Sequence, residues 1–230
     1  KLSVEDAARK LRYTVLFEIL SKHKSEYIVT AHHRDDQAET LLLHLLRGSG
    51  AEGLGGMRCH NNSIVRPFLQ VSRRMLEAYC AMRSLDYRTD SSNMDLYYTR
   101  NKVRHILLPL LEREFNPNIK QALAQTATLI AEDADCLNAL AEEKFLQYVL
   151  QDDHSCSCDT AWLLSLPAAL CSRIIRMMWK KLGAAGLLTF QQTQQVIDLV
   201  YKGSSNKRLM LPGGTCAVSV SYTHLRAHET

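Results

Sequence analysis

The sequence lacks any long hydrophobic run, and this absence excludes several classes of protein. No apolar stretch approaches the ~18 residues that a membrane span needs, and residues 1–20 have no apolar secretory core. The composition, with 46% hydrophobic and 23% charged residues, is not that of a disordered chain. A chain of 230 residues can bury a core in one large or two small domains. We expect a globular cytoplasmic protein with no membrane partner.

The sequence also lacks C-x-x-C spacing and an initiator methionine. Its seven cysteines are an odd number, which favours free thiols in a reducing compartment. Cys156 and Cys158, near His154, leave a metal loop open, but their narrow spacing favours a polar loop between helices. Because the first residues already have a helical pattern, we expect the natural protein to begin further upstream.

Residues 28–57 concentrate side chains that bind phosphate and metal ions. A β-branched run at 27–30 is followed by a polar cluster at 32–36 and by apolar residues at helical spacing (38, 41, 42, 45 and 46). This order predicts a strand, a loop and a helix. In α/β proteins ligands collect at such a strand end, where the helix N-terminus presents free N–H groups to phosphate.

The polar cluster has a structural as well as a chemical interpretation. Asp36 as N-cap with Glu39 three residues later predicts a capping box, and acids in a first helical turn favour the helix dipole. However, the adjacent pairs His32-His33 and Asp35-Asp36 are more polar than a cap requires. Asp36 is a candidate for holding Mg²⁺ against phosphate oxygens.

Glycines and basic residues follow the predicted helix. The pattern G-x-G-x-x-G from Gly48 to Gly53 is not a dinucleotide fingerprint, because it follows a helix instead of a strand. We interpret it as a close-approach loop in which Arg47 and backbone N–H groups meet phosphate. Residues 58–104 contain nine Lys or Arg and four acids. This excess makes nucleic acid a candidate partner, with a solvated basic face as the alternative.

Helical periodicity dominates the rest of the chain. We predict an opening helix of ~18 residues, a helix capped by Ser72, a helix at 103–111 kinked by Pro109, and a long helix from Asn116-Pro117. The second of these should turn Met75, Leu76, Tyr79 and Cys80 inward. Further predictions are a polar loop at 151–159, helices at 167–182 and after Thr189, and a hairpin at 207–211 and 215–220. Residues 221–230 continue no pattern, and we interpret them as non-native.

The run from Thr30 to Met57 resembles the second signature of the tRNA(Ile)-lysidine synthetases, bacterial members of the PP-loop ATP pyrophosphatase superfamily. The other shared motifs are Glu5-x-x-Ala8-Arg9, Arg12-Tyr13, Arg66-Pro67, Ser72-Arg73, Asp90-Ser-Ser-Asn93 and Tyr98-Thr-Arg100-Asn101-x-x-Arg104. The resemblance is strong over residues 1–115 and weaker beyond. The family's phosphate-cradling loop, Ser-Gly-Gly-x-Asp-Ser, is absent, and His44 stands where an arginine is common.

The resemblance implies an α/β fold, in which a partial PP-loop (adenine nucleotide alpha hydrolase-like) domain precedes a mainly helical substrate-binding domain with a terminal β-hairpin. It implies a PP-loop domain at 1–115, a connecting long helix at 116–150 and a tRNA substrate-binding domain at 151–220. The tail at 221–230, interpreted above as non-native, follows these domains.

The implied activity is that of an ATP-dependent carbon–nitrogen ligase. ATP adenylates the base carbonyl oxygen of the wobble cytidine in isoleucine tRNA with a CAU anticodon, and free L-lysine then displaces AMP to give lysidine. The implied cofactors are ATP and Mg²⁺, the partners are tRNA(Ile) and L-lysine, and a homodimer is left open. Without its phosphate-cradling loop, this chain alone is expected to be inactive.

The resemblance also implies roles for individual residues. Asp36 and Arg100 are the candidate catalytic residues, and Asp36 is also the candidate metal ligand. The candidate nucleotide-binding residues are His32, Asp35, Glu39, Arg47, Gly48, Ser49 and Gly50. The candidate substrate and tRNA residues are Arg66, Arg73, Asp90, Asn93, Asn101 and Arg104. For Asp90 and Asn93, shaping a turn is an equal alternative.

Two other functions stay open. A tRNA thiolase of the same superfamily is disfavoured, because such enzymes usually present paired cysteines. A non-catalytic helical RNA-binding module would need only the basic stretch, and the His/Asp cluster would then be incidental.

Overall fold

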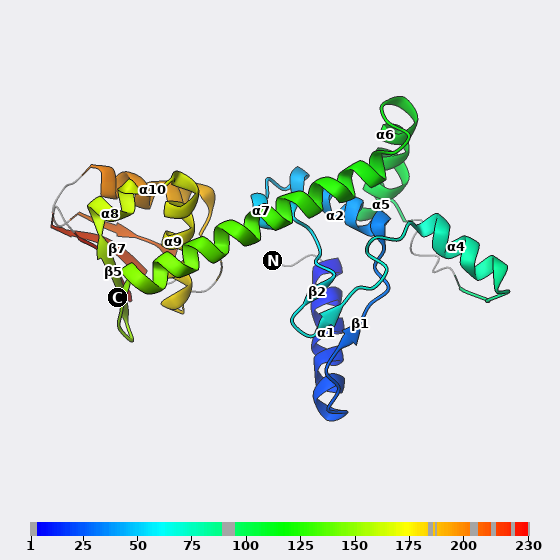
Figure 1. Cartoon of the computed structure of the whole chain (residues 1–230), viewed down its shortest axis with the longest axis horizontal. Helices are drawn as coiled ribbons and strands as arrows, with labels where there is room; N and C mark the ends of the chain where they lie inside the picture. The colour runs from blue at the N-terminus through cyan, green and yellow to red at the C-terminus, as the bar shows by residue number, and fades with distance from the viewer. Residues whose placement is uncertain are drawn as a thin grey trace. The chain divides into compact units, whose positions relative to one another are not determined.

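The chain divides into two compact units, Lys1–Ala134 and Asp135–Thr230, each with its own small sheet (Figure 1). The computed structural model describes residues 4–88, 95–183, 186, 188–202, 207–212, 215–221 and 224–229. Within these ranges no helix is long and apolar enough to cross a membrane. The predicted α/β class is confirmed.

The first unit contains a three-stranded sheet of order β1-β3-β2. Its elements are α1 (Val4–Lys22), β1 (Ile28–Val29), α2 (Arg34–Leu46), α3 (Ala51–Leu54), β2 (His60–Asn61), β3 (Ile64–Val65), α4 (Arg73–Met82), α5 (Thr99–Lys102), the π-helical turn η2 (Val103–Leu107) and α6 (Leu108–Glu114). β1 runs parallel to β3, so the chain between them crosses over through α2 and α3. This crossover places the N-terminus of α2 directly after the carboxyl end of β1.

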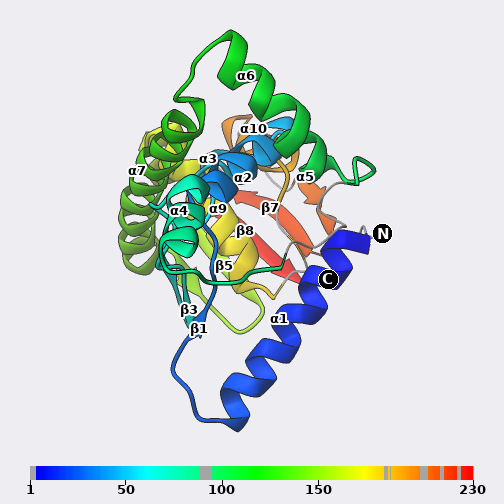
Figure 2. The same ribbon diagram turned by 90° about the vertical axis from the view of Figure 1, so that its right-hand side faces the viewer.

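The core of the first unit forms between α2 and the segment after α5. Ala38, Leu42 and Leu43 of α2 pack with Val103 and Leu108, all less than 9% exposed. The predicted stripe is therefore correct for the first turns of α2, which lies beside α3 and α5 (Figures 1 and 2). It is wrong for Leu45 and Leu46, which are exposed.

A π-helical turn lies immediately upstream of Pro109, the residue at which the sequence predicts a kink. In this turn the N–H of Leu108 donates to the carbonyl of Val103, five residues earlier. Proline has no N–H to donate and its ring crowds the carbonyl four residues before it, so a wider turn relieves both problems. Arg104 lies within this turn.

α4 begins where the sequence predicts but does not bury its apolar face. The Ser72 hydroxyl accepts from the Met75 N–H at 3.2 Å, as an N-cap should. Met75 and Tyr79, predicted to face inward, are 60% and 51% exposed, and α4 has no buried residue. Periodicity shows which helix face is apolar but cannot show whether another element covers it.

The second unit is built on an antiparallel sheet of order β4-β5-β8-β7-β6. Its elements are the second half of α7 (Ile119–Tyr148), β4 (Leu150–Gln151), β5 (Ser155–Asp159), α8 (Thr160–Ser165), α9 (Ala168–Lys181), α10 (Phe190–Tyr201), β6 (Arg208–Met210), β7 (Thr215–Ser221) and β8 (His224–Glu229).

The predicted helices and the β6–β7 hairpin are present. The loop predicted at 151–159 is wrong, because these residues form a β-hairpin. Residues 224–229, for which the sequence shows no pattern, form β8; their non-native origin stays a prediction.

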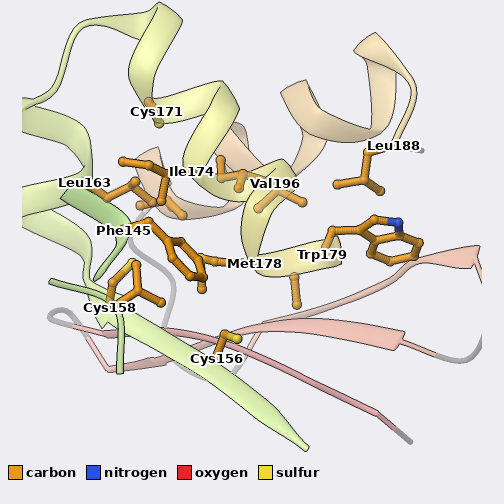
Figure 3. Packing of buried hydrophobic residues seen from close by; sticks show 14 of the residues in the cluster. Phe145, Cys156, Cys158, Leu163, Cys171, Ile174, Met178, Trp179, Leu188 and Val196 are labelled. Carbon is orange, nitrogen blue, oxygen red and sulfur yellow. The ribbon is translucent and has the colours of Figure 1, made fainter. Parts of the chain in front are cut away.

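Cysteines form part of the core of the second unit. Figure 3 shows Phe145, Ile174 and Met178 between the helices and the strands, with Cys156 and Cys158 on β5. Positions two apart on a strand share a face, so both thiols are buried. All seven cysteines are free, and the described residues contain no His/Cys/Asp/Glu group able to hold a metal ion. The metal interpretation of this segment therefore has no support in the described structure.

Thiol reactivity tests this packing. Burial raises the pKa of Cys158 to about 12 and raises the pKa values of Cys156 and Cys171. Since the thiolate is the nucleophile, the exposed Cys59 and Cys136 should be alkylated rapidly at pH 8, whereas these three should react only in denaturant. Mass mapping of the labelled peptides measures this order. Labelling of Cys158 in the native chain as fast as Cys59 would contradict the packing.

Candidate functional site

α2 begins with a capping box that differs from the predicted one. The Asp36 N–H donates to His33 Nδ1 at 3.3 Å, and Asp36 Oδ2 accepts from the His33 N–H at 3.0 Å. The prediction of Asp36 as N-cap with Glu39 at N3 is wrong, because the extended backbone of His33 lets its ring cap the helix instead. Asp36 is the N3 residue, and Glu39 takes no part in the cap.

Glu39 is instead the centre of a buried charge cluster. Its side chain is 2% exposed and accepts from Arg104 Nε at 2.6 Å, from Arg104 Nη2 at 2.9 Å and from Arg100 Nε at 2.9 Å. Asp36 Oδ1 accepts from Arg104 Nη2 at 3.2 Å and lies 3.5 Å from Arg100 Nη2. Each pair of residues lies one turn apart on its helix, so two carboxylates face two guanidinium groups.

The charges of the cluster balance one another, because its two carboxylates pair with its two guanidinium groups. Burial alone would lower the pKa of Arg104, but the hydrogen bonds and charge of Glu39, with the charges of Asp36 and Asp35, outweigh burial and raise it. Arg104 therefore stays cationic at any pH at which the protein is folded.

Asp36 does not by itself form a magnesium site. Its oxygens are already engaged by one backbone N–H and two guanidinium groups, and no group of three or more ligating side chains occurs in the described parts of the chain. An ion beside Asp36 would need phosphate oxygens for most of its ligands and would meet two neighbouring positive charges. The residues present fit a phosphate better than a free Mg²⁺ ion.

His32 lies just before α2 in a positively charged environment. Its Nδ1 lies 2.8 Å from the Thr30 hydroxyl oxygen. Burial lowers the pKa of His32, the charges of Arg66, Arg9 and Arg100 lower it further, and the charge of Asp36 opposes them. The imidazole is therefore neutral near pH 7 and can donate or accept a hydrogen bond without adding charge.

Among the predicted tRNA residues that the structure describes, Arg66 is the most buried. It is 5% exposed and donates Nη1 to the Arg58 carbonyl at 2.9 Å, while its buried Nε has no hydrogen-bond partner within the described ranges. Burial of a cation with an unused donor is costly unless an anion or water completes it. This donor is a further feature of the site that suits a phosphate.

The other predicted tRNA residues lie in varied surroundings. Arg73 is exposed; its N–H donates to Asp35 Oδ1 at 3.1 Å and its Nε to Glu77 at 2.8 Å. Asn101 is 8% exposed and donates to the Asp95 carbonyl at 2.8 Å. Asp90 and Asn93 lie outside the described residues.

The structure separates the predicted nucleotide-binding residues into two groups. His32, Asp35 and Glu39 lie at or near the start of α2, whereas Arg47, Gly48, Ser49 and Gly50 follow its end. The helix has 13 residues, which corresponds to about 20 Å. No single phosphate group can contact both ends of this helix.

Gln37, which the sequence did not single out, and His44, noted there only as a departure from the family, connect the glycine-rich loop at residues 48–57 to α2. The buried carboxamide of Gln37 hydrogen-bonds the backbone of Gly55 and Met57, and His44 Nδ1 bonds the Gly53 carbonyl. The only sequence signal for Gln37 is a polar residue at a position that helical spacing places next to the apolar stripe.

Comparisons with known proteins agree with this division into units. Residues 1–111 match the family model described as PP-loop domain, and residues 159–226 match the TilS substrate binding domain. The chain is 39% identical over 210 residues to the tRNA(Ile)-lysidine synthase of Thermobifida fusca (strain YX), covering 91% of this chain and 64% of the relative.

Other relatives give the same result. The chain is 34% identical to the tRNA(Ile)-lysidine synthase of Geobacillus kaustophilus (strain HTA426), over 93% of this chain and 47% of the relative. It is 34% identical to that of Nostoc sp. (strain PCC 7120 / SAG 25.82 / UTEX 2576), over 93% of this chain and 67% of the relative. The chain thus spans about half to two thirds of the length of these relatives. With a PP-loop domain, a TilS substrate binding domain and these identities, the chain belongs to the tRNA(Ile)-lysidine synthase family.

Proposed function

We propose that this protein ligates L-lysine to the wobble cytidine of isoleucine tRNA with a CAU anticodon, through an adenylated cytidine, at the expense of ATP. The observation that carries the proposal is the buried cluster of Asp36, Glu39, Arg100 and Arg104 at the start of α2, in a chain of this family. We place the reaction in the cytoplasm, where tRNA and ATP are both present.

Within the cluster, solvent exposure distinguishes the side chains that can contact a substrate from the side chain that only holds the others in place. The Asp36 side chain is 12% exposed, and those of Arg100 and Arg104 are 23% and 19% exposed, whereas that of Glu39 is 2% exposed. We assign catalytic contact to Asp36 and Arg100, substrate contact to Arg104, and the orientation of both guanidinium groups to Glu39. Preorganised cations of this kind stabilise the negative charge that develops on departing phosphates.

The remaining assignments follow the two ends of α2. His32 and Asp35 are proposed for one part of the nucleotide, and Arg47 to Gly50 for another. Arg66, Arg73, Asn101, Asp90 and Asn93 are proposed for the tRNA side. ATP supplies the adenylyl group, and Mg²⁺ bound mainly by its phosphates would neutralise pyrophosphate; Asp36 is the proposed protein ligand of that ion.

The direct test is mass spectrometry of the tRNA product. A full-length version of the protein that includes a phosphate-cradling loop should, with ATP and lysine, add the mass of lysine less one water to a cytidine of tRNA(Ile). Sulfur incorporation in a parallel reaction that contains ATP and a sulfide donor in place of lysine would indicate the thiolase alternative. tRNA binding without any mass change would indicate the non-catalytic module.

Substitutions at Asp36 and Glu39 should separate catalysis from stability. Asp36→Asn keeps the cap acceptor for the His33 N–H, so it should cost about 1 kcal/mol of unfolding free energy yet greatly reduce tRNA-dependent pyrophosphate release. Glu39→Gln removes the main partner of the partly buried guanidinium groups of Arg100 and Arg104 and should cost about 3 kcal/mol, the lower end for a buried ion pair. Denaturant unfolding and pyrophosphate release measure the two effects.

The contrast between the two variants decides the assignment. If Asp36→Asn releases pyrophosphate at the wild-type rate, Asp36 is not catalytic. If Glu39→Gln unfolds at the wild-type denaturant concentration, Glu39 does not hold the cluster together.

The lowered pKa of His32 gives a pH-dependent prediction. In the unfolded chain the imidazole of His32 binds a proton near pH 6.5, whereas in the folded chain its pKa is lower. The contribution of neutral His32 to the free energy of unfolding should therefore be fully present above pH 6.5 and should decrease as the pH falls toward the pKa of the folded state. NMR titration should place the His32 midpoint below 6.5, and His32→Gln should lack this part of the acid destabilisation. A midpoint at or above 6.5 would contradict the proposed environment.

A further inference from the structure

The carboxamide of Gln37 hydrogen-bonds residues 55–57, the last part of the glycine-rich loop, through both its nitrogen and its oxygen. Its Nε2 donates to the Met57 carbonyl at 3.1 Å and to the Gly55 carbonyl at 3.4 Å, and its Oε1 accepts from the Met57 N–H at 2.8 Å. The side chain is 3% exposed, so water does not compete for these bonds. Both donors and the acceptor of the amide are used on one short segment of backbone.

We call these hydrogen bonds from Gln37 the clamp. Gly56, which lies between the two residues that Gln37 bonds, leaves the space that the amide occupies. Its φ of +63° is in the left-handed region, and a Cβ there would lie 2.7 Å from Gln37 Oε1 and 2.9 Å from Nε2. A glycine is therefore required both by the backbone conformation and by the approach of the amide. Any side chain at position 56 would have to displace Gln37.

A second contact extends the clamp along α2. His44 lies seven residues after Gln37, two turns of the helix or about 10 Å, and its Nδ1 bonds the Gly53 carbonyl. The loop after Arg47 thus folds back along α2, with Gly53 beside the end of the helix and Met57 beside its start. Short bonds within the loop, such as Leu54 N–H to the Gly50 carbonyl at 3.0 Å, tie the anchored part to residues 47–50.

We propose that Gln37 is the positioning residue of the glycine-rich loop, and that its carboxamide sets the place of Arg47 to Gly50 and so the affinity for the phosphates of ATP. This inference rests on the proposed function, because it takes residues 47–50 to be nucleotide contacts. Gln37 touches no substrate in this role and acts only through the loop.

The geometry predicts an effect on binding that is separate from the charge cluster. Successive helical residues point about 100° apart, so Gln37 faces the loop while Asp36 faces Arg100 and Arg104. Loss of the clamp should therefore release the loop and leave the carboxylate–guanidinium cluster in place. The expected result is a higher KM for ATP with little change in kcat.

Gln37→Glu tests the clamp with almost no change in size. The carboxylate would face the carbonyl oxygens of Gly55 and Met57, to which the amide now donates. In the full-length protein we expect the KM for ATP to rise about tenfold or more, with kcat within about threefold and the KM for lysine unchanged. Gln125→Glu, the same substitution at an exposed site on α7, is the control and should keep wild-type values.

Gly56→Ala attacks the same contact from the other side. It should raise the KM for ATP as Gln37→Glu does, and the double variant should be no worse than either single one, because both remove one interaction. Gly183→Ala controls for backbone strain: its φ is +67°, but a Cβ there meets nothing within 4 Å. It should lower stability and leave the KM for ATP unchanged.

Hydrogen exchange makes the outcome independent of activity. The Met57 amide should be protected in the wild-type chain and exchange much faster in Gln37→Glu, with the amides of α2 unaffected. Fast exchange of Met57 in the wild type, or an unchanged KM for ATP in active Gln37→Glu and Gly56→Ala enzymes, overturns the proposed role of Gln37. A wild-type enzyme that never modifies tRNA overturns the proposed function instead, while the exchange result still decides whether the clamp exists.

Discussion

The buried carboxylate of Glu39 is the constraint on which the first unit depends. A charge that is 2% exposed is tolerated only when it is paired and hydrogen-bonded; Arg104 donates to both oxygens of Glu39, and Arg100 donates to one of them. That pairing requires α5 and η2 to lie against α2, which the burial of Val103 and Leu108 against Ala38 and Leu42 also favours. Ionic and apolar contacts therefore select the same arrangement.

Different faces of α2 consequently contact different parts of the first unit. One face carries Asp36 and Glu39 toward the arginines, another packs Ala38 and Leu42 in the core, and a third holds the glycine-rich loop through Gln37 and His44. Because a rigid helix supports all three, the position of the loop and the position of the charged groups are coupled without direct contact between them. This is how a short segment can organise much of a binding site.

Local signals predicted much of the secondary structure. Ser72 and Thr189 cap their helices, Gly183 with its positive φ follows α9, and the β6–β7 hairpin forms where expected. One error was local: the side chain of His33, and not that of Asp36, caps α2. The other errors occurred where tertiary contacts decide. Tyr79 lies on an apolar helix face that no element buries, and residues 151–159 form a hairpin whose strand β5 pairs with β4 and β8.

The sequence by itself determined the family, the order of the elements and the residue types at the start of α2, because these depend on composition and spacing along a few turns of chain. Only the tertiary structure decided that Glu39 joins Arg100 and Arg104 across more than 60 residues, and that Gln37 meets Gly56. Such contacts depend on how elements pack, and residues distant in the chain carry no local signal of their partners.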